Sequence, residues 1–184
     1  MIDAMSRRRM LRFGAAGAAS VVLCQPRLAQ ALAPSPTPPR RLRFENLHTG
    51  EAAALDYWVD GRYVGEAIRR IDHLLRDHRT GEVRAMDKGL LDLLHRLRQT
   101  LGTEAPFQII SGYRSPRTNA MLASRSDGVA RNSLHTDGLA VDIRVPGRTL
   151  REVRDAALSL KAGGVGFYAR SDFVHVDIGR VRSW

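Results

Sequence analysis

Two short stretches of the sequence place histidines beside carboxylates, close to apolar runs. Residues 133–142 (SLHTDGLAVD) contain His135 and Asp142, and residues 172–177 (DFVHVD) contain His175. A catalytic zinc ion takes nitrogen and oxygen ligands in a tetrahedron and keeps one of its four positions open for water. The three side chains would supply the protein ligands of such an ion. The spacing therefore predicts a zinc site, with partly exposed loop histidines as the alternative interpretation.

A hydrolytic zinc site also needs a group that accepts a proton, and two aspartates near His175 are candidates. Asp177 lies two residues after His175, so a strand would direct both side chains to the same face of the sheet. Asp172 falls in the expected turn before this strand. We expect Asp177 to be the general base. The alternatives are that Asp172 is the general base, that Asp177 instead orients a metal ligand, or that neither aspartate is the base.

The helices and strands that position these residues are indicated by the spacing of apolar residues and by turn residues. Apolar residues three or four apart indicate a helix, and alternating apolar and polar residues indicate a strand. Strands are expected at 107–110, 140–145, 165–168 and 173–178, after two or three short strands within 42–64. Helices are expected at 68–75, 90–101, 117–124 and 150–162, the last closed by Gly163 and Gly164. Three further histidines on the first two helices are expected to face solvent: His73, His78 and His95. This order predicts a small single α+β domain, with helices packed on one face of a mainly antiparallel sheet.

The first 33 residues have the features of an export signal. Three arginines, Arg7–Arg9, precede the apolar run Phe13–Leu23 and small residues that suit cleavage, and they resemble a twin-arginine leader. The run is shorter than the ~20 residues of a membrane span, so we expect a removed leader rather than an anchor. Lipidation at Cys24 is a weaker alternative. We therefore expect a periplasmic protein, exported by the twin-arginine route.

Past the leader, the proline-rich residues 34–41 are expected to form a linker. Residues 42–184 are expected to form the folded domain that contains the zinc site. The whole chain carries a formal net charge of +10, and removal of residues 1–33 would leave a basic domain without cysteine, since Cys24 is the only one. Cysteine-based ligands and nucleophiles are thereby excluded from the domain. The charge favours an anionic neighbour. We expect a monomer with no stable membrane insertion after removal of the leader.

Three segments of the domain resemble, in order and spacing, the zinc D-Ala-D-Ala metallopeptidase superfamily and, more narrowly, its murein endopeptidase K group. They are Ser111–Ser115 (SGYRS), His135-x6-Asp142 and Phe173–Asp177 (FVHVD). The likeness extends over residues 42–184. It implies the small α+β fold of D-Ala-D-Ala peptidases and hedgehog-like domains, with Zn²⁺ as the cofactor.

The same resemblance implies roles for individual residues. The superfamily's metal ligands correspond to His135, Asp142 and His175. Arg114 corresponds to an arginine that binds the substrate carbonyl or carboxylate and the oxyanion that develops on it. Related dipeptidases carry an acid at the position of Asp172, and endopeptidase K-like members carry the H-x-D pattern that Asp177 completes. Tyr113 and Ser133 are expected near the cleft, with packing as the alternative for Tyr113.

The activity implied is zinc-assisted hydrolysis of peptide cross-links in peptidoglycan (murein), without a covalent intermediate. The substrate would be cross-linked stem peptides, and the bond between two diaminopimelate residues is the specific expectation. A catalytically inactive peptidoglycan-binding protein on the same fold is the alternative. Nucleic-acid binding fits poorly, because the arginines are scattered, no aromatic-basic motif appears and an exported protein meets little nucleic acid.

Overall fold

A computed structural model describes residues 37–125 and 130–184 of the chain. The expected leader and residues 34–36 of the expected linker lie outside these residues. The first strand begins at Arg40, two residues before the expected start of the domain. Arg40 and Arg41 pair with the next strand, opposite Trp58 and Asp56. Their side chains also form ion pairs with Asp92 and Asp56.

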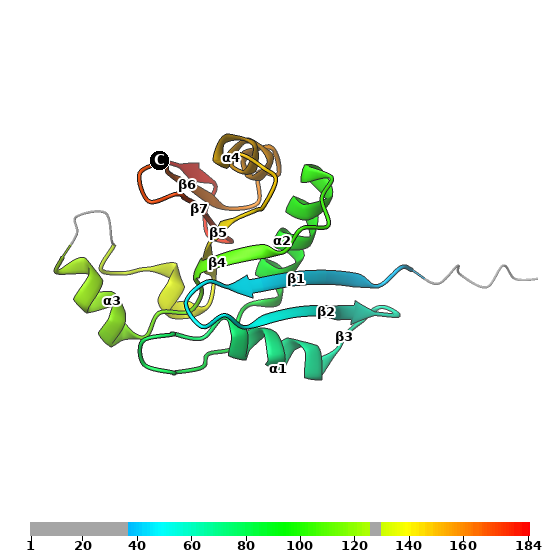
Figure 1. Ribbon diagram of the computed structural model, residues 1–184, viewed down its shortest axis with the longest axis horizontal. Helices are drawn as coiled ribbons and strands as arrows, with labels where there is room; N and C mark the ends of the chain where they lie inside the picture. Colours follow the sequence, from blue (N-terminus) through cyan, green and yellow to red (C-terminus); the bar gives the residue numbers. More distant parts are fainter. Residues whose placement is uncertain (1–36, 126–129) are drawn as a thin grey trace, which may run out of the picture. The chain divides into compact units, whose positions relative to one another are not determined.

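Eight strands of the described residues form one sheet in the order β3-β2-β1-β4-β5-β7-β6-β8 (Figure 1). Neighbouring strands are antiparallel except in the β1·β4 and β6·β8 pairs, which are parallel. The strands are β1 (Arg40–Asn46), β2 (Ala52–Val59), β3 (Arg62–Tyr63), β4 (Phe107–Ser111), β5 (Ala140–Arg144), β6 (Gly164–Tyr168), β7 (Phe173–Asp177) and β8 (Arg182–Ser183).

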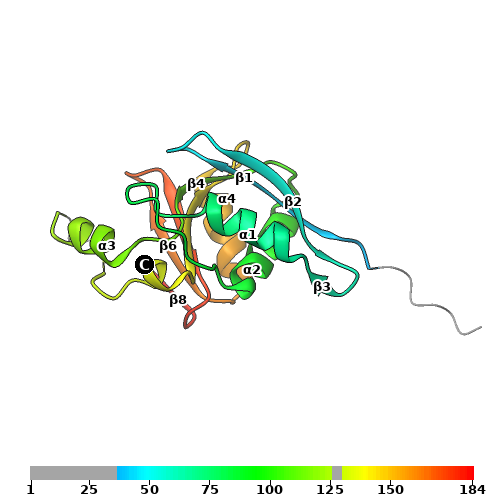
Figure 2. The same ribbon diagram turned by 90° about the horizontal axis from the view of Figure 1, so that it is seen from below.

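Helices α1, α2 and α4 cover one face of this sheet, as Figure 2 shows from below. The helical elements are α1 (Gly65–Leu74), α2 (Lys88–Leu101), α3 (Pro116–Ala123), the 3-10 helix η1 (Leu134–Asp137) and α4 (Leu150–Ser159). The leucine stripe of α2 is buried against the sheet, and this helix begins at the N-cap Asp87 and ends at Gly102 in the left-handed conformation. The α+β prediction, with helices on one face of a mainly antiparallel sheet, is confirmed. Helix α3 lies apart from this layer (Figure 1).

Side-chain alternation on the central strands separates an apolar face from a polar one. Val141 and Ile143 on β5, and Val174 and Val176 on β7, are fully buried in the core. The intervening residues point to the opposite face. There the strand register aligns one lateral row across four strands: Ser111, Asp142, His175 and Gly166. This row is the floor on which the candidate site is built.

The expected helix over 150–162 is wrong at its end, because α4 stops at Ser159 and the chain turns through Lys161 at φ 47°. Gly163 and Gly164 do not serve to end the helix. A Cβ on Gly163 would lie 1.7 Å from the Asp177 carbonyl oxygen, and one on Gly164 would lie 2.4 Å from the Asp177 carboxylate. Both glycines are required because β6 passes directly against the end of β7.

The three helix histidines have different surroundings. His73 is exposed, as expected. His95 is buried on α2 with its ring edge-on to Tyr57, so the expected solvent-facing position is wrong for this residue. His78 lies in the turn after α1 and stacks on His48 at 3.8 Å between ring centroids. Burial, together with the neighbouring His48, lowers the pKa of His78 to about 4.

Within the described residues, no helix combines the length and the apolar character needed to cross a bilayer.

Candidate metal centre and cleft

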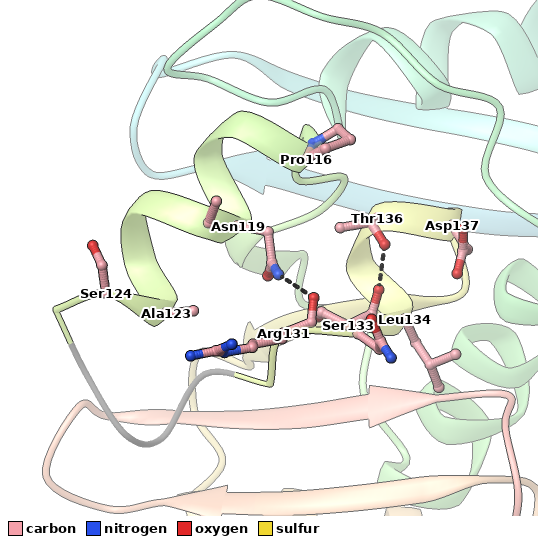
Figure 3. A pocket seen from close by; sticks show the side chains of 11 residues that line it. Pro116, Asn119, Ala123, Ser124, Arg131, Ser133, Leu134, Thr136 and Asp137 are labelled. Carbon is pink, nitrogen blue, oxygen red and sulfur yellow. Dashed lines mark hydrogen bonds between the residues drawn. The ribbon is translucent and has the colours of Figure 1, made fainter.

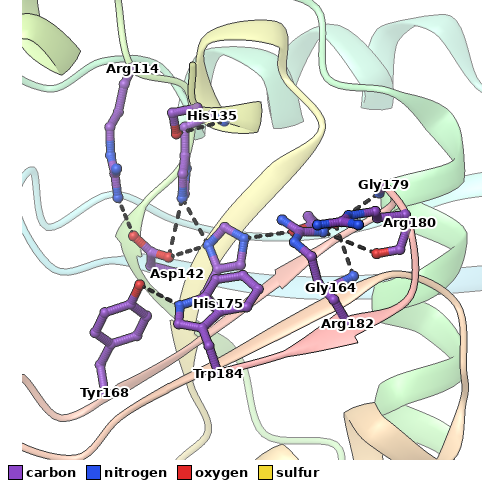
Figure 4. A network of polar contacts seen from close by, with 12 residues as sticks. Arg114, His135, Asp142, Gly164, Tyr168, His175, Gly179, Arg180, Arg182 and Trp184 are labelled. Atoms are coloured by element: carbon purple, nitrogen blue, oxygen red, sulfur yellow. Dashed lines mark hydrogen bonds and ion pairs between the residues drawn. The ribbon is translucent and has the colours of Figure 1, made fainter. Parts of the chain in front are cut away.

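The structure brings the three predicted metal ligands together on the polar face of the sheet. His135 Nε2 lies 3.2 Å from Asp142 Oδ1 and 3.1 Å from His175 Nδ1, and the third edge of this triangle, between His175 Nδ1 and Asp142 Oδ1, is 2.9 Å (Figure 4). Ligand atoms around a tetrahedral zinc ion, with bonds of about 2.0–2.1 Å, are separated by about 3.3 Å. The triangle therefore needs to open by only a few tenths of an ångström to hold such an ion.

The outer nitrogen of each histidine has a partner that leaves the inner nitrogen free for a metal. His135 Nδ1 lies 2.7 Å from the Gly112 carbonyl oxygen, and His175 Nε2 lies 3.0 Å from Asp177 Oδ2. Both partners only accept hydrogen bonds, so each outer nitrogen of the neutral ring carries the proton. The lone pairs of the two inner nitrogens then point into the triangle. This is the arrangement that orients metal-binding histidines in proteins.

Asp142 completes the triangle with one carboxylate oxygen and binds Arg114 with the other. Burial opposes the ionisation of Asp142, but the nearby His135, His175 and Arg114 outweigh it and hold the pKa of this carboxyl below its ordinary value. The Arg114 side chain is also fixed, because its Nε donates to Ser111 Oγ at 2.8 Å. The carboxylate is thus ionised and held in one orientation, as a metal ligand requires.

Glycines allow the two loops that carry His135 and Arg114 to approach the domain closely. A Cβ on Gly112 would lie 2.3 Å from the Leu75 carbonyl oxygen, which also accepts from Tyr113 N at 2.7 Å. Gly138 ends η1 at φ 72°, and a Cβ there would lie 2.6 Å from the Ala85 carbonyl oxygen. These close approaches fix the start of the SGYRS loop and the turn between His135 and β5.

Tyr113 and Ser115 attach the SGYRS loop to the rest of the domain. Tyr113 is buried in the core, so the packing alternative holds for this residue. Ser115 caps the N-terminus of α3, and both its backbone N and its hydroxyl donate to the buried Asp77. The loop therefore carries Arg114 between two fixed ends.

The Asp177 carboxylate contacts the outer nitrogen of His175, on the far side of this ring from the metal triangle. Its carboxylate accepts from the backbone N of Gly164 and Gly179, from Arg182 at 2.7 Å and from His175 Nε2, and it is fully buried. Burial raises its pKa, but these partners outweigh burial and hold the pKa below the ordinary range. Asp177 therefore lies on the same face of the sheet as His175, as the strand period predicted. Its carboxylate contacts the nitrogen of His175 that points away from the metal triangle.

Asp172 is in the turn before β7, as expected, with a φ of 56°. Its largely exposed side chain forms an ion pair with Arg144. The residues on either side of it, Ser171 and Phe173, both line the cleft that contains the metal triangle. Asp172 is therefore at the edge of the cleft, and its carboxylate is much less enclosed than that of Asp177.

The cleft has a volume of about 560 Å³ and exposes one side of the metal triangle to solvent. Ser133 lies in its wall, as expected. Three arginines also line it, namely Arg79, Arg114 and Arg182, and Asp142 is the single carboxylate among the described lining residues. Arg114 and Arg182 are paired with Asp142 and Asp177, and Arg79 has no ion pair among the described residues, so one positive charge is in excess. This excess favours an anionic ligand.

A second hollow of about 660 Å³ lies between α3 and residues 131–137 and shares Ser133 with the cleft (Figure 3). Asn119 on α3 donates to the carbonyl oxygens of Ala130 and Arg131 and so connects the two walls. Thr136 Oγ1 donates to the Ser133 carbonyl oxygen at 2.6 Å and closes the turn of η1.

Sequence reasoning missed several residues that build this site. Arg182 binds Asp177, and Tyr168, Trp184 and His48 line the cleft, yet none was singled out as a site residue. Strand β8 is two residues long, too short to give a periodic signal. Arg182 and Trp184 fall within residues 42–184, over which the resemblance extends, but neither belongs to the three motifs that carry it.

Comparison with known proteins identifies similar chains over almost the full length. A family profile described as peptidoglycan L,D-endopeptidase MepK matches residues 34–184. The chain is 44% identical over 180 residues to the peptidoglycan L,D-endopeptidase MepK of Escherichia coli strain K12, covering 97% of each chain. It is 38% identical over 180 residues to the probable peptidoglycan L,D-endopeptidase MepK of Haemophilus influenzae, covering 97% of this chain and 95% of the relative. The family match includes all three residues of the metal triangle.

Proposed function

The chain belongs to the peptidoglycan L,D-endopeptidase MepK family, and from this membership we propose that it is a zinc-dependent endopeptidase cutting L,D cross-links of peptidoglycan. The resemblance read from the three motifs is thereby confirmed at the level of the family and of peptidoglycan endopeptidase activity. The observation that carries the proposal is the buried triangle of His135, Asp142 and His175 at the floor of an open cleft.

Two nitrogens and one carboxylate oxygen are the donor set that we assign to zinc. They suit this ion better than magnesium or calcium, which prefer oxygen ligands. A zinc ion held here would polarise the peptide carbonyl and lower the pKa of a bound water to about 7. One carboxylate among the ligands leaves a net positive charge for that purpose.

Arg114 is the residue that we assign to the developing oxyanion. Its side chain reaches the metal triangle through Asp142, lines the cleft and is held by Ser111. A guanidinium stays charged at every relevant pH and presents several N–H groups in a fixed plane. Because Ser111 and Asp142 fix its position before substrate arrives, Arg114 can stabilise charge on the scissile carbonyl oxygen without rearranging.

We assign the proton-accepting role to Asp172 and a positioning role to Asp177. The Asp177 carboxylate is enclosed by donors from four described residues and orients His175. Asp172 has a surface ion pair with Arg144, and such exposed pairs contribute only about 0–1 kcal/mol. Its carboxylate is therefore free to turn from Arg144 towards the cleft when a substrate is bound.

The cross-linked stem peptides of peptidoglycan carry several carboxylates, which fits the arginine-lined cleft. We expect the zinc-loaded domain to convert L,D-cross-linked muropeptide dimers into monomers and to leave D,D-cross-linked dimers intact. The products are identified by mass spectrometry after digestion of purified peptidoglycan, with chelator-treated protein as the control. Binding of dimers without any release of monomers would contradict the proposal and favour the inactive binding protein.

Action on peptidoglycan implies a location outside the cytoplasm, and we propose the twin-arginine route for export. Arg7–Arg9 lie outside the described residues, so this proposal depends on the sequence alone. Replacing all three arginines with lysine is expected to leave the precursor in the cytoplasm, measured by cell fractionation. A normal amount of the variant in the periplasm would contradict this route.

A further inference from the structure

We propose that Trp184 forms an apolar platform that binds the aliphatic side chain next to the scissile bond, which makes it a specificity-determining residue of the cleft. This inference rests on the proposed endopeptidase function and names a residue beyond the metal ligands and the two assigned catalytic groups. The ligand chemistry is a linear hydrocarbon side chain, such as the methylene chain of a diamino acid.

The position of Trp184 beside the metal triangle is fixed by three hydrogen bonds. Its backbone N donates to the Val165 carbonyl oxygen at 3.3 Å, and its own carbonyl oxygen accepts from Phe167 N at 3.0 Å. Its indole Nε1 donates to the Tyr168 hydroxyl at 2.8 Å. The ring centroid lies 5.3 Å from that of His175 (Figure 4). The indole is therefore held in one place at the metal-binding wall of the cleft.

The sequence of β6 makes room for this indole. Gly166 is the direct cross-strand neighbour of His175, and a Cβ on it would lie 2.8 Å from ring atoms of Trp184. Any other residue at this position would displace the ring. Two residues further on, Tyr168 stacks on Phe173 at 4.6 Å between centroids and continues the aromatic wall along the cleft.

Core packing alone does not explain why the indole is held there. Half of the Trp184 surface, 50%, is exposed in spite of the three bonds, and the ring lines the cleft. An aromatic side chain contributes most to folding when it is fully buried. A fixed but exposed indole beside a catalytic centre is instead typical of a surface that becomes buried when a ligand binds.

The distance to the metal triangle decides which part of the substrate reaches Trp184. One peptide residue spans at most about 3.3–3.6 Å along an extended chain. A ring centroid 5.3 Å from the His175 ring is thus within reach of a side chain adjoining the scissile bond. The glycan strand is attached at the far end of the stem peptide, several residues away. The platform is therefore assigned to the peptide rather than to the sugar.

The guanidinium of Arg182 lies beside the Trp184 ring but does not provide a binding site for a substrate carboxylate. Its guanidinium lies 4.8 Å from the Trp184 ring centroid, but its Nη1 and Nη2 both donate to Asp177. The positive charge is matched by that buried carboxylate. The free surface of the indole accordingly favours methylene groups over an anion.

A pair of synthetic cross-linked peptides tests the proposal. They differ only in the side chain on the carbonyl side of the scissile bond, which is either a four-carbon aminoalkyl chain or a methyl group. Reduced-amide analogues of both peptides are titrated into zinc-loaded protein by calorimetry, so that binding is measured without turnover. Cleavage of the parent peptides by the unmodified protein separately tests the proposed function.

Trp184→Ala is expected to weaken binding of the long-chain analogue by ~10–50-fold, the effect of exposing two to three methylene groups. Binding of the methyl analogue should change by less than ~3-fold. Trp184→Phe should fall between, and Val181→Ala, an exposed residue of the same segment, should change neither. An equal loss for both analogues, or a loss of zinc from Trp184→Ala, would overturn the proposal and make Trp184 a structural support of His175.

Discussion

Replacing His135 with alanine is expected to abolish zinc retention and to reduce hydrolysis of cross-linked peptides by ~10³-fold or more. A site with three protein ligands has no spare donor, and the ion contributes several kcal/mol of transition-state stabilisation, about a factor of ten for each 1.4 kcal/mol. Metal analysis after dialysis and single-turnover digestion of a defined cross-linked peptide would measure the two effects.

His135 is the most informative of the three ligands to remove. Its outer nitrogen contacts only a carbonyl oxygen among the described residues, whereas loss of Asp142 would remove the partner of the partly buried Arg114 guanidinium. Loss of His175 would likewise remove a partner of Asp177. Breaking either of these buried charged contacts would destabilise the fold as well as the metal site.

His73→Ala is the matched control, since this histidine is exposed on α1 and is not among the residues that line the cleft. It should keep one zinc per chain and full activity. Retention of one zinc per chain by both His135→Ala and the double variant His135→Ala/His175→Ala would refute the assigned metal centre.

The fold was predictable from the sequence where a periodic pattern was long enough. The leucine stripe of α2 and the alternation on β5 and β7 predicted the correct elements. Burial of one face repeats apolar residues every three or four positions in a helix and every second position in a strand. The end of α4 was not predictable in this way. Gly163 and Gly164 read as helix terminators, but their actual constraint is close contact with Asp177, distant in sequence.

The sequence predicted which residue types build the candidate site. It predicted less well where each side chain points. The histidines and Asp142 converge because β5 pairs with β7 and Gly138 turns the chain between His135 and β5. The strand period also placed Asp177 beside His175. It could not determine which ring nitrogen Asp177 would contact, because this depends on the bonds from Arg182 and from the backbone of β6.

Asp172→Asn is expected to reduce turnover by ~10²–10⁴, the usual contribution of a positioned general base, while zinc content and melting temperature stay unchanged. Asparagine is nearly isosteric with aspartate, and Asp172 is in an exposed turn, so the substitution removes the proton acceptor without disturbing the core. Steady-state cleavage of a defined cross-linked peptide gives the rate, and metal analysis gives the zinc content.

Asp177→Asn is expected to act on the metal instead. One carboxylate oxygen would become an NH₂ group facing N–H donors of His175, Arg182 or the β6 backbone, so at least one buried donor would lose its acceptor. Zinc affinity should fall by ~10–100-fold, as for other groups that orient a ligand histidine, and activity should recover when zinc is added in excess. Competition with a fluorescent chelator measures this affinity.

Arg144→Gln tests whether the ion pair with Arg144, rather than the Asp172 carboxylate itself, affects turnover. This variant keeps the proposed base and removes only its surface partner, so turnover should change by less than ~5-fold, because the exposed pair contributes at most about 1 kcal/mol. If Asp177→Asn keeps its zinc but loses turnover while Asp172→Asn remains active, proton transfer belongs to Asp177. The enclosed hydrogen bonds around that carboxylate would then have to open when substrate binds, and the assignment made from their geometry would be wrong.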